Sequence, residues 1–192
     1  LMLRITKWRI IVFILSFLCM VGRHSSLGAW SFVKDKVHDD SGFSSSTLGI
    51  FDTTYLFCYG IGNYISGTLG DNFPIRLVVP AGLLLSALCY SAVVILGYLD
   101  YYNVYLFSVM FGLNGFAQST VWPGTVAVMG NWFPRTTRGT VMGFWSSNAS
   151  TGNVVGSQTG GIYSALTNYS WEPVMITTCG YMVAIALFFF IF

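Results

Sequence analysis

Apolar stretches alternate with short polar breaks along the whole chain. Each stretch has about the length that an α-helix needs to cross a bilayer, roughly 20 residues rising 1.5 Å each. No strand-like alternation of apolar and polar residues competes with this pattern. The sequence therefore predicts an all-α membrane protein, a bundle of six transmembrane helices over residues 8–30, 47–69, 75–99, 104–129, 140–166 and 174–192.

The breaks between the predicted helices are polar, and several contain proline or glycine. The first break, KDKVHDDSGFSSS over residues 34–46, we interpret as a loop. The later ones read GDNFP, DYYN, NWFPRTTRG and TNYSWEP. Pro123 lies inside the fourth predicted helix, where it predicts a kink because proline has no N–H to donate.

The composition supports the membrane interpretation and excludes other classes. Of the 192 residues, 54% are hydrophobic and only 8% are charged, whereas a soluble domain has about 25% charged residues. The net charge of +2 and the lack of any nucleic-acid motif argue against a nucleic-acid partner. The four cysteines have no CxxC spacing, and histidines and carboxylates are too scattered for a metal site, so we expect no cofactor. No catalytic constellation indicates an enzyme.

Basic residues predict the orientation. Most of them fall on one side of the predicted membrane, where they outnumber acids: Arg4, Lys7, Arg9, Arg76, Arg135 and Arg138. Lys34 and Lys36 fall on the other side, among five acidic residues. The excess of Lys and Arg in cytosolic loops places the N-terminus on the cytosolic side. Asn168 then begins a glycosylation sequon on the far side, which we interpret as unused because it lies so close to the membrane.

Arg23 is the most informative residue, because it lies inside the first predicted helix after a run of thirteen uncharged residues. A guanidinium keeps its proton, and at membrane depth it costs at least about 2.5–3.5 kcal/mol. Such a residue usually faces a bundle interior, so Arg23 predicts an anion site. The other interpretation is an arginine that extends to the interface from the last turns of its helix.

Two segments resemble a known family. The turn GTLGDNFPIR, residues 67–76, resembles the cytosolic loop of the major facilitator superfamily, with Asp71 and Arg76 at matching positions. Residues 114–157 are similar to the sugar-phosphate and glycerol-3-phosphate:phosphate antiporters of that superfamily. The matching positions are Gln118, Trp122-Pro123, Asn131-Trp132-Phe133, Arg138-Gly139, Trp145 and Gly152-Asn153.

The resemblance implies roles for individual residues. It implies that Arg23 binds the substrate phosphate, with His24 where a lysine is usual, and that Tyr59 and Gln118 line the cavity. It further implies that loop residues such as Asp71, Arg76 and Arg138 hold neighbouring helices together. Taken alone, His24 is also consistent with a hydrogen-bonded histidine outside the site, and Tyr59 and Gln118 with polar contacts between helices.

Two further features concern the helices themselves. Gly152, Gly156 and Gly160 recur at every fourth residue, a spacing that allows two helix backbones to approach closely. Asp52 is the one acid inside a predicted span. It is consistent with a proton-coupling carboxylate or, since it lies near the start of its helix, with a helix N-terminal role.

The chain length predicts one half of the fold, because the family has two six-helix halves. The resemblance therefore implies the N-terminal half of an exchanger of organophosphates for inorganic phosphate, acting by alternating access in a lipid bilayer with a second half. The alternatives are a half-transporter retained as a structural subunit among other membrane subunits, and one chain of a split transporter.

Overall fold

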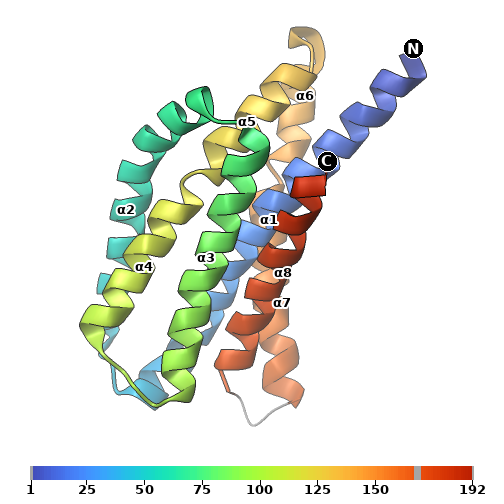
Figure 1. Cartoon of the computed structure of the whole chain (residues 1–192). Coiled ribbons are helices and arrows are strands. Elements are labelled where there is room, and N and C mark those ends of the chain that lie inside the picture. Colours follow the sequence, from blue (N-terminus) through green and yellow to red (C-terminus); the bar gives the residue numbers. More distant parts are fainter. Residues whose placement is uncertain (1, 167–169, 192) are drawn as a thin grey trace.

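The computed structural model describes residues 2–166 and 170–191, with the side chains of all of these except 2–4, 71 and 191. Asn168, the predicted sequon, lies outside the described residues. Within those ranges the chain is helical and contains no strand (Figure 1). The helices are α1 (Met2–Ser41), α2 (Ser45–Asn72), α3 (Ile75–Tyr98), α4 (Val104–Gln118), α5 (Val121–Trp132), α6 (Arg135–Trp145), α7 (Asn148–Leu166) and α8 (Glu172–Ile191).

The helix predicted over 104–129 is divided into α4 and α5, which lie end to end (Figure 1). Pro123 has no N–H, so the carbonyl four residues earlier, that of Ser119, loses its helical donor. The hydroxyls of Ser119 and Thr120 turn back and donate to the carbonyls of Phe116 and Ala117, at 2.6 and 3.0 Å. Side chains therefore satisfy carbonyls at a break that lies within an apolar stretch.

The helix predicted over 140–166 begins earlier, at Arg135, and is divided into α6 and α7. Its break falls at Ser146 and Ser147, whose hydroxyls donate to the carbonyls of Met142 and Phe144 at 2.8 and 2.7 Å. Serine pairs are a recognised cause of helix breaks, because their hydroxyls compete with backbone N–H groups for the same carbonyls. No proline marks this second break.

The loop predicted over residues 34–46 was wrong for most of its length, because α1 continues to Ser41. Val33 and Val37 are both fully buried and lie one turn apart on the same face of α1. Lys36 and Asp40 form an ion pair at the i, i+4 spacing that stabilises helices. α1 ends where Gly42 adopts a φ of +70°, a left-handed conformation that glycine adopts without a steric penalty.

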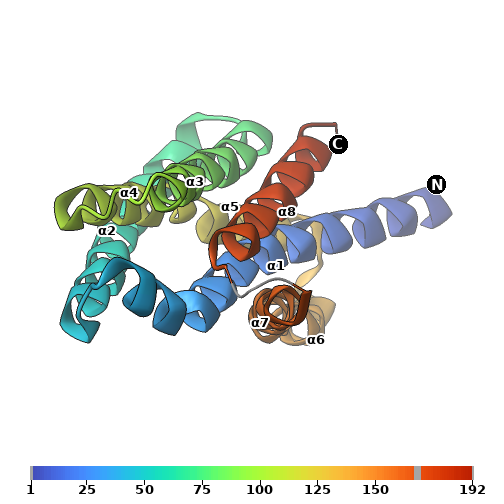
Figure 2. The same cartoon turned by 90° about the horizontal axis from the view of Figure 1, so that it is seen from below.

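α1 is the central helix and packs between α7 and α8 (Figure 2). α2 packs on α4, and α3 packs on both α4 and α8. Aromatic rings join α1, α2 and α4: the Phe111 ring lies 4.6 Å from that of Trp30 and 5.5 Å from that of Phe51. These contacts fix the positions of α2 and α4 relative to α1.

Among the described helices, three are both long enough and apolar enough to cross a membrane: Ile5–Ser41, Ile75–Tyr98 and Glu172–Phe190. The breaks explain why α4 and α5 do not qualify, since they have 15 and 12 residues. α6 has only 11 residues, and α7, with 19, is rich in glycine, serine and threonine. α2 is 28 residues long but contains many polar residues as well.

Candidate functional site

Arg23 lies in the middle of α1 and is buried, with only 6% of its surface exposed. Its side chain therefore lies inside the helix bundle. It is level with Gly152 of α7, since a Cβ on that glycine would lie 2.5 Å from the Cβ of His24. The guanidinium thus lies deep in the bundle, surrounded by residues of neighbouring helices.

Neutral groups contact the Arg23 guanidinium. Its Nη1 lies 3.1 Å from Nε2 of His24, and its Nη2 donates to the Tyr55 hydroxyl at 3.5 Å. Arginine has no acceptor, so the His24 contact requires a lone pair on Nε2 and hence a neutral imidazole. The Arg23 Nε–H is buried and has no hydrogen-bond partner among the described residues.

Tyr59 contacts Arg23 through its ring. The guanidinium carbon lies 4.6 Å from the ring centroid, which is cation–π geometry. The Tyr59 ring is stacked on that of Tyr55, one turn away on α2, with centroids 6.1 Å apart and planes inclined by 15°. Two tyrosines of α2 therefore contact the guanidinium, Tyr59 with its ring and Tyr55 with its hydroxyl.

Gln118 ends α4 and is fully buried. Its Oε1 accepts a hydrogen bond from the Tyr55 hydroxyl at 2.8 Å. Its Nε2 donates to oxygens of Ser86 and Ser26, at 2.9 and 3.2 Å, and lies 3.3 Å from Oδ1 of Asn114. Gln118 is therefore joined to Arg23 through Tyr55, and both of its polar atoms are engaged with the protein.

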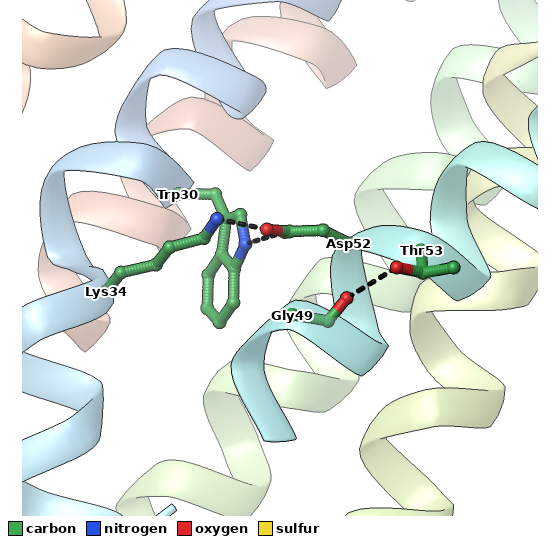
Figure 3. A network of polar contacts seen from close by, with 5 residues as sticks. All are labelled: Trp30, Lys34, Gly49, Asp52 and Thr53. Carbon is green, nitrogen blue, oxygen red and sulfur yellow. Dashed lines mark hydrogen bonds and ion pairs between the residues drawn. The ribbon is translucent and has the colours of Figure 1, made fainter. Parts of the chain in front are cut away.

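No carboxylate contacts Arg23 among the described side chains, whose two ion pairs lie elsewhere. One of them joins α1 to α2: Lys34 pairs with Asp52, whose Oδ1 also accepts from Nε1 of Trp30 at 2.9 Å (Figure 3). In Figure 3 both side chains of α1 point toward Asp52, and Thr53 next to it donates to the Gly49 carbonyl at 2.8 Å. This geometry assigns Asp52 a structural contact between two helices.

The three glycines of α7 lie against α1. A Cβ at Gly156 would lie 2.1 Å from the Ser25 carbonyl oxygen, and one at Gly160 would lie 2.2 Å from the Phe32 ring. A Cβ at Gly152 would meet the Val21 carbonyl oxygen at 2.7 Å. The spacing of these residues therefore lets α7 approach the part of α1 that carries Arg23.

The predicted loop residues lie at the end of the bundle that holds the N-terminus. Arg138 donates to the carbonyls of Gly130 and Phe133, at the C-terminal end of α5. Arg9 of α1 donates to the neighbouring Trp132 carbonyl at 3.0 Å. Arg76 is exposed and lines a hollow of about 420 Å³ together with Trp132. Asp71 lies in α2, and its side chain is outside the described residues.

Sequence reasoning missed Tyr55 and the polar residues behind Gln118. Tyr55 lies four residues before Tyr59 on the same face of α2, and this spacing was a signal that could have identified it. Ser26, Ser86 and Asn114 lie in different helices and are buried at 1% exposure or less. Within the part of the chain that the structure describes, no group of three or more His, Cys, Asp or Glu residues is arranged to hold a metal.

Comparison with known proteins agrees with this arrangement. The profile of the Major Facilitator Superfamily matches residues 11–192. Sugar phosphate exchanger 3 of Homo sapiens is 34% identical over 211 aligned positions, which cover 94% of this chain and 42% of that protein. The Bos taurus protein of the same name is 34% identical over 218 positions, covering 97% and 43%. A glucose-6-phosphate exchanger of Homo sapiens is 41% identical over 117 positions, covering 60% and 23%.

The chain thus spans about two fifths of the length of the sugar phosphate exchangers that it matches. The family match extends over almost all of the described residues, including both broken helices and Arg23. The chain therefore belongs to the Major Facilitator Superfamily, and within that superfamily its similarity is to the sugar-phosphate exchangers.

Proposed function

We propose that this chain forms one half of a membrane transporter, not an enzyme, that exchanges phosphorylated small organic molecules for inorganic phosphate. The names of its relatives, sugar phosphate exchanger and glucose-6-phosphate exchanger, support this substrate class. The mechanism is alternating access, in which two six-helix halves rock around a site near the middle of the membrane.

The single observation that carries this proposal is a buried cation that contacts no acid. Arg23 is 6% exposed, and the hydrogen-bond partners described for it are neutral. Burying an unpaired charge is costly, and the cost falls when an anion binds beside it. At a separation of about 4 Å and an effective dielectric constant near 20, each unit of anion charge gains about 4 kcal/mol before desolvation is subtracted.

Arg23 also keeps hydrogen-bond donors for a phosphate. A guanidinium has about five N–H groups, of which the described contacts use one on Nη1 and one on Nη2. The Nε–H and one N–H on each terminal nitrogen remain. Phosphate oxygens accept such bonds in pairs, which gives both strength and orientation. Tyr59, whose ring lies against the guanidinium, carries a hydroxyl that would serve as a neutral donor to the phosphate.

The proposed membrane arrangement rests on the end-to-end helix pairs and on where the basic side chains lie. The two broken pairs, α4–α5 and α6–α7, each count as one pass, so the chain crosses the bilayer six times. Arg9, Arg76 and Arg138 gather at one end, and Lys34 pairs with Asp52 toward the other. The positive-inside rule places the N-terminal end in the cytosol.

The test is exchange of labelled phosphate by the purified protein in liposomes loaded with phosphate. We expect Arg23→Ala to abolish uptake and Arg23→Lys to leave part of it, because lysine keeps the charge but loses the paired donors. Arg135→Ala is the matched control, since it removes one exposed positive charge elsewhere and should leave uptake near that of the wild type.

Unchanged exchange in Arg23→Ala would overturn the assignment of the anion site. The two alternatives give other results. A structural subunit neither binds nor exchanges phosphate and is recovered in mild detergent with other membrane proteins. One chain of a split transporter exchanges phosphate only after its partner chain has been added.

A further inference from the structure

The polar side chains behind Arg23 form a chain of hydrogen bonds with one direction. Ser86 donates its proton to Oδ1 of Asn114 at 2.5 Å, so its oxygen is free to accept. Gln118 donates to that oxygen at 2.9 Å, and its own Oε1 accepts the proton of Tyr55 at 2.8 Å. The Tyr55 oxygen then accepts from Arg23 at 3.5 Å. Each donor points away from the guanidinium.

This direction depends on the hydroxyl protons of Ser86 and Ser26. If the Gln118 amide were turned over, its nitrogen would face the Tyr55 hydroxyl and its oxygen would face Ser86. Ser86 and Ser26 both accept from Gln118, and both have already donated their protons, Ser26 to the Arg23 carbonyl at 2.8 Å. These hydrogen bonds therefore favour the amide orientation in which Oε1 of Gln118 faces Tyr55 and Nε2 faces Ser86.

Gln118 consequently has little to offer a ligand directly. It is fully buried, its oxygen is occupied by Tyr55, and its nitrogen faces three protein oxygens. The Tyr55 hydroxyl has one proton, which it gives to Gln118, so it can only accept from Arg23. Tyr55 and Gln118 thus act on the anion site through the guanidinium.

We propose that Tyr55 and Gln118 are positioning residues that orient Arg23 for phosphate, an inference that rests on the proposed function. The Tyr59 ring lies 4.6 Å from the guanidinium carbon and the Tyr55 hydroxyl accepts from Nη2, so the two tyrosines together restrict the orientation of the guanidinium. These hydrogen bonds join side chains of α3, α4 and α2 to Arg23 of α1. The orientation of the guanidinium therefore depends on how four helices pack.

The test is a double-mutant cycle on the affinity for inorganic phosphate, measured by equilibrium binding of labelled phosphate to the purified protein in lipid nanodiscs. We expect Tyr55→Phe and Gln118→Met each to weaken binding about fivefold to tenfold, the effect of losing a hydrogen bond near a charge. The double variant should bind about as weakly as Tyr55→Phe alone, because Gln118 acts through Tyr55.

Tyr163→Phe is the matched control, since it removes the hydroxyl that accepts from Thr177 at 2.9 Å between α7 and α8. It makes the same chemical change in a tyrosine that does not contact Arg23, and it should leave phosphate affinity within about twofold of the wild type. The conservative Tyr55→Phe change keeps the ring and its stacking, so the variant is expected to fold; its elution from a sizing column checks this.

Additive effects in the double variant would overturn the proposal, since they would mean that Gln118 contacts the phosphate itself. Unchanged affinity in both single variants, while Arg23→Ala loses binding, would also overturn it and would leave the proposed function intact. Failure of the wild-type protein to bind phosphate would overturn both.

Discussion

Replacing Gly156 by alanine tests the close approach of α7 to α1. The added Cβ would lie 2.1 Å from the Ser25 carbonyl oxygen and 2.6 Å from the Ala29 backbone nitrogen. Both atoms belong to the backbone of α1, so no side chain can rotate away to relieve the overlap. The Cβ and the Ser25 oxygen must move apart by about 1.4 Å to reach ordinary van der Waals distance, near 3.5 Å.

The expected cost comes from this overlap. Overpacking of a tight contact costs about 1–3 kcal/mol, and a rigid backbone neighbour places Gly156→Ala at the upper end of that range. Gly161→Ala is the matched control on the same helix, because a Cβ there meets nothing within 4 Å. Alanine is favoured over glycine in a helix by about 0.5–1 kcal/mol, so the control should be unchanged or slightly more stable.

The assay is thermal unfolding of the purified variants in one detergent, followed by the fraction that remains soluble and monodisperse. For a protein of this size, a loss of about 3 kcal/mol lowers Tm by roughly 6–12 °C. If Gly156→Ala melts within about 2 °C of Gly161→Ala, the close packing of α7 on α1 is refuted, because the overlap would then cost less than about 1 kcal/mol.

Two other predictions use the same unfolding assay. Asp52→Asn keeps the acceptor for Trp30 but removes the ion pair with Lys34. Because the Lys34 and Asp52 side chains are 28% and 35% exposed, we expect the free energy of unfolding to fall by only about 0.5 kcal/mol, and this difference to disappear in high salt. A loss of stability that does not depend on salt would contradict this. Arg138→Gln removes the donors to carbonyls at the C-terminal end of α5, so we expect the free energy of unfolding to fall by about 1–2 kcal/mol. Arg135→Gln, at an exposed position, is the control and should cause no loss. Equal stability of the two variants would contradict the role of Arg138 at this helix end.

Sequence reasoning identified Arg23 because a charge within an apolar run is conspicuous. It did not identify Tyr55, because a tyrosine in such a helix is common and only the folded position of Gln118 gives its hydroxyl a role. The partnership of Ser86 with Asn114 joins residues of two helices, and local patterns contain no information on which faces will meet.

Helix boundaries show a similar division. The chemistry of proline predicted a kink at Pro123, and the break lies just before it, between Gln118 and Val121. The break at Ser146 depends on a hydroxyl that donates to a backbone carbonyl, a contact that no residue pattern marks. The polar residues after Val33 indicated a loop. The helix continues there because Lys34 forms an ion pair with Asp52 of α2 and Val37 packs in the core. In each case a tertiary partner decided the local structure.

The order of the Arg23 partners along the chain has a consequence for biosynthesis. α1 is made before α2 and α4, and it carries a cation whose supporting side chains, Tyr55 and Gln118, lie on α2 and at the end of α4. Until α4 has emerged, the first helix must bear alone the cost of at least about 2.5 kcal/mol for a central arginine in lipid. We therefore expect stable insertion of α1 to depend on α2 and α4, which would couple membrane entry to the assembly of the polar site around Arg23.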